Sequence, residues 1–131
     1  LYGYELKQSD KFIYPELIIP VPLHPSRLKK RGYNQSECIA AGISSVLGIP
    51  VCSDNLSRIE NTRTQTRKSR FARYENLKNA FLLKNPNPLI NKHILLIDDV
   101  MTTGSTLEAC SLKLLEIEGL KISFCTIAYA E

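Results

Sequence analysis

Apolar residues in this chain fall into short runs that alternate with longer stretches of helical spacing. Strands are predicted at the short runs, which are Leu17–Pro22, Ile49–Cys52, Ala80–Leu83, His93–Ile97 and Lys121–Ala130. Helices are predicted from the cap Asn34 to Gly48, over Ser69–Asn79 and over Ser105–Glu118. Because strands alternate with helices, the pattern indicates an α/β fold: one domain, 1–131, with a mainly parallel, twisted sheet flanked by helices.

Polar segments separate these elements and are expected to be loops or linkers. Residues 1–16 are expected to form an N-terminal extension or linker. Residues 23–33, rich in proline and basic side chains, and residues 85–91 are expected to be connecting loops. Residues 53–75 contain few core-quality side chains before Phe71, and we expect them to form a flexible cover loop that passes into the helix at Ser69.

Composition narrows the class of protein. The 131 residues suit one domain, and no apolar run approaches the roughly 20 residues that cross a bilayer, so no membrane span is expected. The four cysteines are widely spaced and form no CxxC pair, which favours buried, reduced thiols over a zinc site. Reduced thiols indicate a cytoplasmic protein.

Positive charge is concentrated in two segments. Residues 27–31 and 58–73 hold ten of the seventeen Lys and Arg residues and one acid, which leaves seven bases against twelve acids elsewhere. This concentration indicates an anionic partner, such as phosphate, pyrophosphate or nucleic acid.

The strongest chemical signal is the segment His93–Thr106, with the sequence HILLIDDVMTTGST. An apolar strand is followed by Asp98 and Asp99 and then by a loop of small residues that opens a helix. In open α/β sheets ligands bind at this edge. Backbone N–H groups, hydroxyls and a helix N-terminus suit a phosphate dianion, and the two acids can accept hydrogen bonds from sugar hydroxyls. A strand end and a helix cap without further function would also explain these residues, but the whole constellation favours a ligand site.

This segment resembles the phosphoribosyl pyrophosphate signature of type I phosphoribosyltransferases. The resemblance implies that Asp98 and Asp99 grip the ribose hydroxyls. It implies a 5′-phosphate site made of Thr102, Thr103, Gly104, Ser105 and Thr106. It further implies a Mg²⁺ cofactor between ribose and pyrophosphate, which the acids would hold mostly through hydroxyls and water.

Two other stretches are similar to the ComF family of competence-associated proteins. The first stretch combines the motif VPLHP, then Arg27, then the motif RGYNQ, which begins at Arg31. The second is the segment RTQTRKSRFARYENLKNAF, which begins at Arg63. The second stretch also distantly resembles glutamine phosphoribosylpyrophosphate amidotransferases. The 131 residues do not include the N-terminal zinc module usual in ComF proteins, and removal of that module from a longer chain stays open; a glutamine-hydrolysing domain and an N-terminal cysteine nucleophile are not among these residues either. Ammonia from glutamine is therefore not expected with this chain alone.

The basic segments acquire roles through the same resemblance. The segment after the first strand matches the pyrophosphate loop of these transferases, so Arg27 and Arg31 are expected to contact pyrophosphate, with Lys29 and Lys30 as weaker candidates. A solvated basic turn is the alternative. His24 is expected to be structural. From the cover loop, the candidates to reach pyrophosphate or the acceptor are Arg63, Gln65, Arg67 and Arg70.

Three functions remain open at this point. The leading hypothesis is a phosphoribosyltransferase, a pentosyl-transferring glycosyltransferase of nucleotide metabolism similar to amidophosphoribosyltransferases, acting on a nitrogen acceptor. The alternative is a ComF-type DNA-uptake accessory that binds single-stranded DNA and partner proteins, such as a competence helicase, without turnover; Tyr33, Phe71 and Tyr74 would then be available for stacking. A ligand-responsive regulator is the third. The oligomeric state stays open, with a homodimer as one option.

Overall fold

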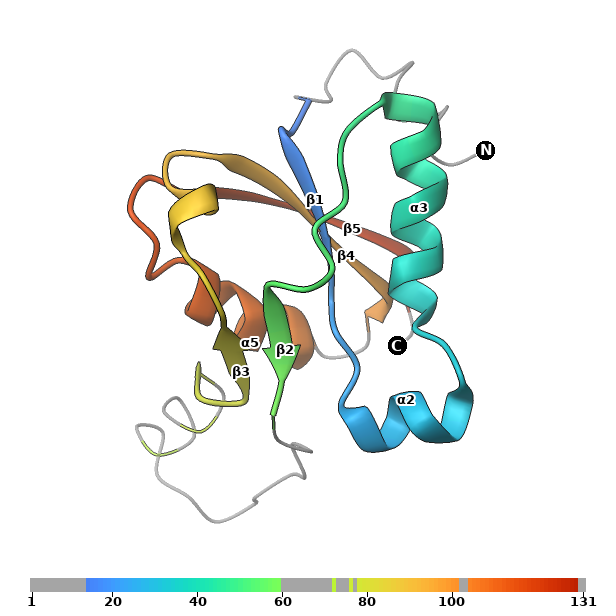
Figure 1. The fold of residues 1–131 in the computed structure, drawn as a ribbon. Coiled ribbons are helices and arrows are strands. Elements are labelled where there is room, and N and C mark those ends of the chain that lie inside the picture. Colours follow the sequence, from blue (N-terminus) through green and yellow to red (C-terminus); the bar gives the residue numbers. More distant parts are fainter. Residues whose placement is uncertain (1–13, 60–71, 73–75, 77, 102–103, 130–131) are drawn as a thin grey trace.

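A three-stranded parallel sheet forms the centre of the computed structural model, which describes residues 14–59, 72, 76, 78–101 and 104–129 (Figure 1). The sheet has the order β1-β4-β5, and its strands are Leu17–Pro20, His93–Met101 and Lys121–Tyr129. Both pairings are parallel. The predicted strand at Ile49–Cys52 is reduced to a single parallel bridge between Val51 and Ile18.

Two helices cover opposite faces of the sheet, α3 (Gln35–Leu47) and α5 (Ser105–Leu114) (Figure 1). The alternation along β4 divides its apolar residues between them. Leu95 and Ile97 pack in the cluster that contains Ile43 of α3, whereas Ile94 and Leu96 pack with α5. All four strand residues are at most 1% exposed. The run Ile94–Ile97 is apolar at every position, as coverage on both faces of the sheet requires.

The strands of the sheet have unequal lengths, and this difference shapes the site. Pro20, the last residue of β1, pairs with Ile97, but β4 continues beside β5 to Met101. The prediction that the strand ends at Ile97 is wrong, because the ladder to β5 persists past that point. Asp98 and Asp99 therefore lie within β4, beyond the end of β1.

The basic segment after β1 contains a helix that the sequence analysis did not predict. Helix α2 covers Pro25–Arg31, so the expected loop at 23–33 is wrong over these residues. Nδ1 of His24 caps the helix by accepting from the N–H of Ser26 at 3.1 Å, which agrees with a structural role for His24. Proline suits the first turn, and the basic residues of the last turn suit the helix dipole. The helix buries no residue, so it lacks the apolar stripe by which helices are usually recognised.

A two-stranded antiparallel ribbon, β2 (Leu56–Arg58) and β3 (Phe81–Leu83), lies beside α5. The ribbon corrects the expected loop at 53–75 over the residues of β2. Leu56 and Phe81 are 4% and 1% exposed, so burial against the α5 side of the sheet accounts for the strand. Beyond it, residues 72, 76 and 78 are helical, inside the predicted helix Ser69–Asn79, and residues 60–71 and 73–75 of the predicted cover loop fall outside the described residues.

The remaining connections are short. A 3-10 helix, η1, occupies Asn87–Leu89 within the expected loop at 85–91. Helix α5 ends at Leu114, four residues earlier than predicted, because a tighter turn then buries Ile117. Gly119 has a φ of 70°, and a Cβ at this position would collide with the side chain of Asn91. Among the helices that the structure describes, none combines the length and apolar character needed to cross a membrane.

Candidate functional site

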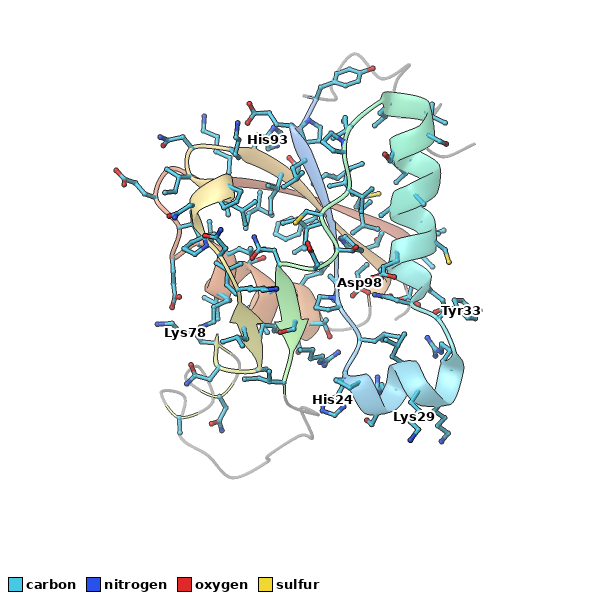
Figure 2. All side chains as sticks on the ribbon, viewed as in Figure 1. His24, Lys29, Tyr33, Lys78, His93 and Asp98 are labelled. Atoms are coloured by element: carbon cyan, nitrogen blue, oxygen red, sulfur yellow. The ribbon has the colours of Figure 1, made fainter. Side chains whose placement is uncertain are left out.

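Asp98 and Asp99 form the centre of the candidate site, at the carboxyl end of β4 where β1 has already ended. Oδ1 of Asp98 accepts a hydrogen bond from the N–H of Asp99 at 2.9 Å and lies 3.5 Å from Oγ of Ser36. Figure 2 shows Asp98 beside the first turn of α3. The structure thus brings one predicted ligand-binding acid against a helix N-terminus that comes from another part of the chain.

The carboxyl group of Asp98 is energetically unfavourable in its ionised form. Burial is the main cause that raises its pKa from 3.8 to about 6, and a hydrogen bond with the carboxyl of Asp99 adds to the effect. The hydroxyl of Ser36 and the backbone N–H of Asp99 act in the opposite direction. A half-buried carboxylate with a neighbouring acid is stabilised by any ligand that donates hydrogen bonds or brings a cation.

Two residues at the start of α3 hold this arrangement in place. The side chain of Asn34 accepts from the N–H of Ser36 at 3.0 Å and donates to the carbonyl of Val21 at 3.1 Å. Asn34 and Ser36 are 6% and 3% exposed. Asn34 was predicted as the helix cap, which the structure confirms, but its link to the end of β1 and the approach of Ser36 to Asp98 were not predicted.

The start of α5 supplies the second part of the candidate site. Gly104 precedes the helix with a φ of 81°, and its carbonyl accepts from the N–H of Glu108 at 2.9 Å. A Cβ at Gly104 would meet no atom within 4 Å, so the backbone conformation explains the glycine and the space above it is open to a ligand. Ser105 and Thr106 are half-buried in the first turn. Thr102 and Thr103 lie outside the described residues.

The predicted pyrophosphate contacts Arg27 and Arg31 are both exposed on α2. Nη1 of Arg31 donates to Oε1 of Gln35 at 2.9 Å, which links α2 to the first turn of α3. The charge of Arg27 contributes to lowering the pKa of Arg58, which lies at the end of β2. The predicted contacts Arg63, Gln65, Arg67 and Arg70 lie outside the described residues.

Arg58, at the end of β2, is a candidate that the sequence analysis did not single out. Its guanidinium lies 5.5 Å from the ring centroid of Phe81, a cation–π distance. Burial is the main cause that lowers the pKa of Arg58, while the charges of Arg27 and Asp98 act on it in opposite directions. The alternation in Leu56–Arg58, which places Arg58 on the same face as buried Leu56, was the available signal.

The donor set fits Mg²⁺ bound together with phosphates. No group of three or more His, Cys, Asp or Glu side chains that could hold a metal by itself occurs among the described residues. Two adjacent carboxylates and a hydroxyl do occur, at Asp98, Asp99 and Ser36. Mg²⁺ prefers oxygen ligands and commonly takes one or two carboxylates, with water and substrate phosphates completing its shell.

Comparison with known proteins identifies relatives of the chain. Residues 34–131 match the family model described as "Phosphoribosyl transferase domain". The chain is 39% identical over 121 residues to Competence protein F of Haemophilus influenzae, covering 90% of this chain and 53% of that protein. It is 39% identical over 100 residues to the DNA utilization protein YhgH of Salmonella typhi, covering 76% and 43%. Competence protein ComFC of Bacillus subtilis is 31% identical over 107 residues, covering 79% and 41%. The chain thus spans about half the length of these relatives, and the ComF resemblance is confirmed.

Solved structures share the fold at low sequence identity. Adenine phosphoribosyltransferase from Saccharomyces cerevisiae superimposes with a TM-score of 0.61 at 12% identity, covering 98% of this chain and 65% of that one. A purine phosphoribosyltransferase from Pyrococcus horikoshii gives a TM-score of 0.57 at 19% identity, with coverages of 98% and 67%. The predicted α/β fold of the type I phosphoribosyltransferase class is confirmed.

Proposed function

Because this chain belongs to the phosphoribosyl transferase domain family, we propose that it binds 5-phosphoribosyl 1-pyrophosphate with Mg²⁺ and transfers the phosphoribosyl group to a nitrogen acceptor. One observation carries the proposal. Asp98 and Asp99 lie in the last part of β4, beyond the end of β1, and α5 begins at Ser105, directly after Gly104.

The acids are assigned to the sugar and the helix to the phosphate. Ribose hydroxyls donate hydrogen bonds, and the carboxylates of Asp98 and Asp99 accept them. A helix N-terminus presents backbone N–H groups and the positive end of the helix dipole, so the first turn of α5 suits the oxygens of a 5′-phosphate. This division keeps two negative charges on the pentose side and the positive end of a helix on the phosphate side.

The leaving pyrophosphate is assigned to the arginines. Arg58 is preorganised by its stack on Phe81, and the charge of Arg27 already acts on it. Two like charges repel each other, so a pyrophosphate group bound by both arginines would relieve their repulsion. Mg²⁺ would supply charge neutralisation on the pyrophosphate as it leaves C1, held at Asp98 and Asp99 largely through ribose hydroxyls and water.

Thermal unfolding with ligand tests the binding part of this proposal. We expect phosphoribosyl pyrophosphate with Mg²⁺ to raise the melting temperature, because a ligand that binds only the folded state stabilises it. The shift should require both components and should be lost in the double variant Asp98→Asn/Asp99→Asn. Glu118→Gln, an exposed acid beside β5 at the other end of the sheet, is the matched control and should keep the shift. A parent protein whose melting temperature does not respond contradicts the proposal.

Turnover requires a separate measurement. Pyrophosphate release is followed across a panel of nucleobases and amines with the same variants. Release that depends on one class of acceptor supports a transferase. A thermal shift without release from any acceptor instead favours a ligand-responsive regulator that binds the ligand and leaves it intact.

A second candidate function is a DNA-handling accessory, and α2 is the observation that favours it. Helix α2 carries four exposed cationic side chains and buries no residue, and the exposed Tyr33 comes shortly after the helix. Figure 2 shows Lys29 and Tyr33 pointing away from the body of the protein. Exposed cations with an aromatic ring suit the backbone and bases of single-stranded nucleic acid. The names of the relatives, which refer to competence and DNA utilization, agree with this use.

Matched lysine variants, compared over a salt series, distinguish DNA binding at α2 from general adsorption of DNA to a basic protein. Binding of a labelled oligonucleotide should weaken steeply with salt, with a slope in log K against log salt of about −0.7 for each phosphate contact. The double variant Lys29→Ala/Lys30→Ala should reduce that slope. Lys92→Ala/Lys121→Ala removes the same charge from two exposed lysines at the other end of the sheet, where β4 and β5 begin, and should leave binding intact. Equal effects of the two double variants contradict a specific role for α2.

A further inference from the structure

Strand β5 is an edge strand of the described sheet. Its inner side pairs with β4 along its whole length, from Lys121 to Tyr129. No other strand within the described residues pairs with its outer side. Nine residues at about 3.3 Å each give an open edge roughly 30 Å long.

The sequence of β5 lacks the devices that normally protect such an edge. Proteins discourage pairing at exposed edges with charged side chains, proline or bulges. From Ile122 to Tyr129 the strand has no charged residue and no proline, and its register with β4 runs without an inserted residue. Phe124 is 55% exposed on the α5 side of the sheet, and Ile127 is 59% exposed on the α3 side. Apolar side chains therefore flank the edge on both faces.

A groove runs along the same edge between β5 and α5. It has a volume of about 420 Å³ and begins at Gly104. Leu107 and Leu112 of α5 line one side of the groove, and Phe124 and Thr126 of β5 line the other. The walls are mainly apolar, so the groove suits a hydrophobic side chain carried by a strand that pairs with β5.

We propose that the outer edge of β5 pairs with β5 of a second copy of this chain, antiparallel and about a twofold axis, to form one continuous sheet across a homodimer. A twofold axis perpendicular to the sheet keeps each face on its own side. With Thr126 on the axis, each Phe124 lies opposite Ala128 of the other copy. The large ring then faces a small side chain and enters the groove of the partner.

Charge and size favour a second copy as the occupant. The only charge on β5 is Lys121 at its beginning, so an antiparallel pair places the two lysines at opposite ends and brings no like charges together. An edge about 30 Å long, bordered by a layer about 10 Å deep on each face, presents on the order of 600 Å² per copy. The total of about 1,200 Å² reaches the lower limit of a specific interface.

Light scattering over a concentration series tests the proposal. We expect the parent chain to have twice the mass of one chain at high concentration. Phe124→Lys and Ile127→Lys should each convert it to the monomer, because a charge at an exposed edge blocks strand pairing. Leu82→Lys is the matched control: Leu82 is 53% exposed on β3, in the other sheet, and this variant should remain dimeric. A parent that is monomeric at every concentration, or a dimer that both edge variants leave intact, overturns the proposal.

Cross-linking provides a second measurement, and it does not require the two lysine variants to fold. In a Cys38→Ser background, which removes the exposed cysteine, Thr126→Cys should form a cross-linked dimer, since residues facing each other in antiparallel strands have Cβ atoms roughly 5 Å apart. Leu82→Cys in the same background should not. Equal cross-linking at both positions, or none at Thr126→Cys, contradicts the proposed pairing.

Discussion

Replacing Asp98 by asparagine is expected to stabilise the protein while it removes a ligand contact. Asparagine has nearly the same shape, and its side-chain oxygen can still accept from the N–H of Asp99 and from the hydroxyl of Ser36. The variant removes only the negative charge, which burial and the neighbouring carboxyl make unfavourable in the folded state. A single substitution therefore separates the stability of the fold from the chemistry of the site.

The magnitude follows from the pKa of Asp98, which folding raises from 3.8 to about 6. Each pKa unit corresponds to about 1.4 kcal/mol, so a side chain fully shielded from water would cost the folded state about 3 kcal/mol when it ionises. Because the side chain is partly exposed, solvent screening reduces this figure to about 1 kcal/mol. Between these two pH values the folded state binds more protons than the unfolded state, so the free energy of unfolding decreases as the pH rises. The cost is absent below about pH 4 and complete above about pH 7.

Thermal unfolding of the parent and Asp98→Asn over a pH series measures this effect. Above pH 7 the variant should melt about 3 to 5 °C higher than the parent, and the difference should disappear near pH 4. Glu118→Gln, which removes an exposed carboxyl at the other end of the sheet, is the matched control for the substitution. A variant that is less stable than the parent at pH 7.5, or a difference that stays constant with pH, would refute the assignment of a raised pKa to Asp98.

Three further predictions concern the framework around the site. Gly119→Ala should lose at least about 1 to 2 kcal/mol in denaturant unfolding, because its φ is positive and its Cβ meets Asn91; Gly42→Ala, in a helix with open space around it, should gain about 0.5 to 1 kcal/mol. Asn34→Ala should lose about 2 kcal/mol, since it removes a helix cap and leaves a carbonyl at the end of β1 without its donor; wild-type stability would contradict this role. Cys110, whose pKa is raised by burial, should resist alkylation until the protein unfolds, and rapid labelling of the native protein would argue against its buried position.

The fold was predictable where burial leaves a pattern. β4 and the two large helices were found because their apolar residues follow the spacing that two-sided burial imposes. Helix α2 was missed because it buries nothing, so only its cap and first proline indicated it. The ribbon of β2 and β3 was missed in part because three-residue strands carry almost no periodicity, and its stability comes from contacts of Phe81 with the distant α5 side of the core.

The site was predictable to the extent that it is local in sequence. Asp98, Asp99 and the start of α5 are adjacent in the chain, so one segment contains the whole signal. The approach of Ser36 to Asp98 joins residues 62 positions apart, and the charge interaction between Arg27 and Arg58 joins two separate elements. Contacts of this kind depend on how the elements pack, which periodicity does not specify.

The early end of β1 leaves β4 unpaired on that side from Asp98 onward, within the described residues. Because the apolar layers at Ile94–Ile97 come before this point, the residues that follow can change without a new interior being built. Exchange of these residues is expected to redirect one scaffold toward different acceptors, or toward recognition without reaction. Extending β1 by two residues would pair it with Asp98 and Asp99, and so cover the side of β4 from which the proposed ligand is expected to approach.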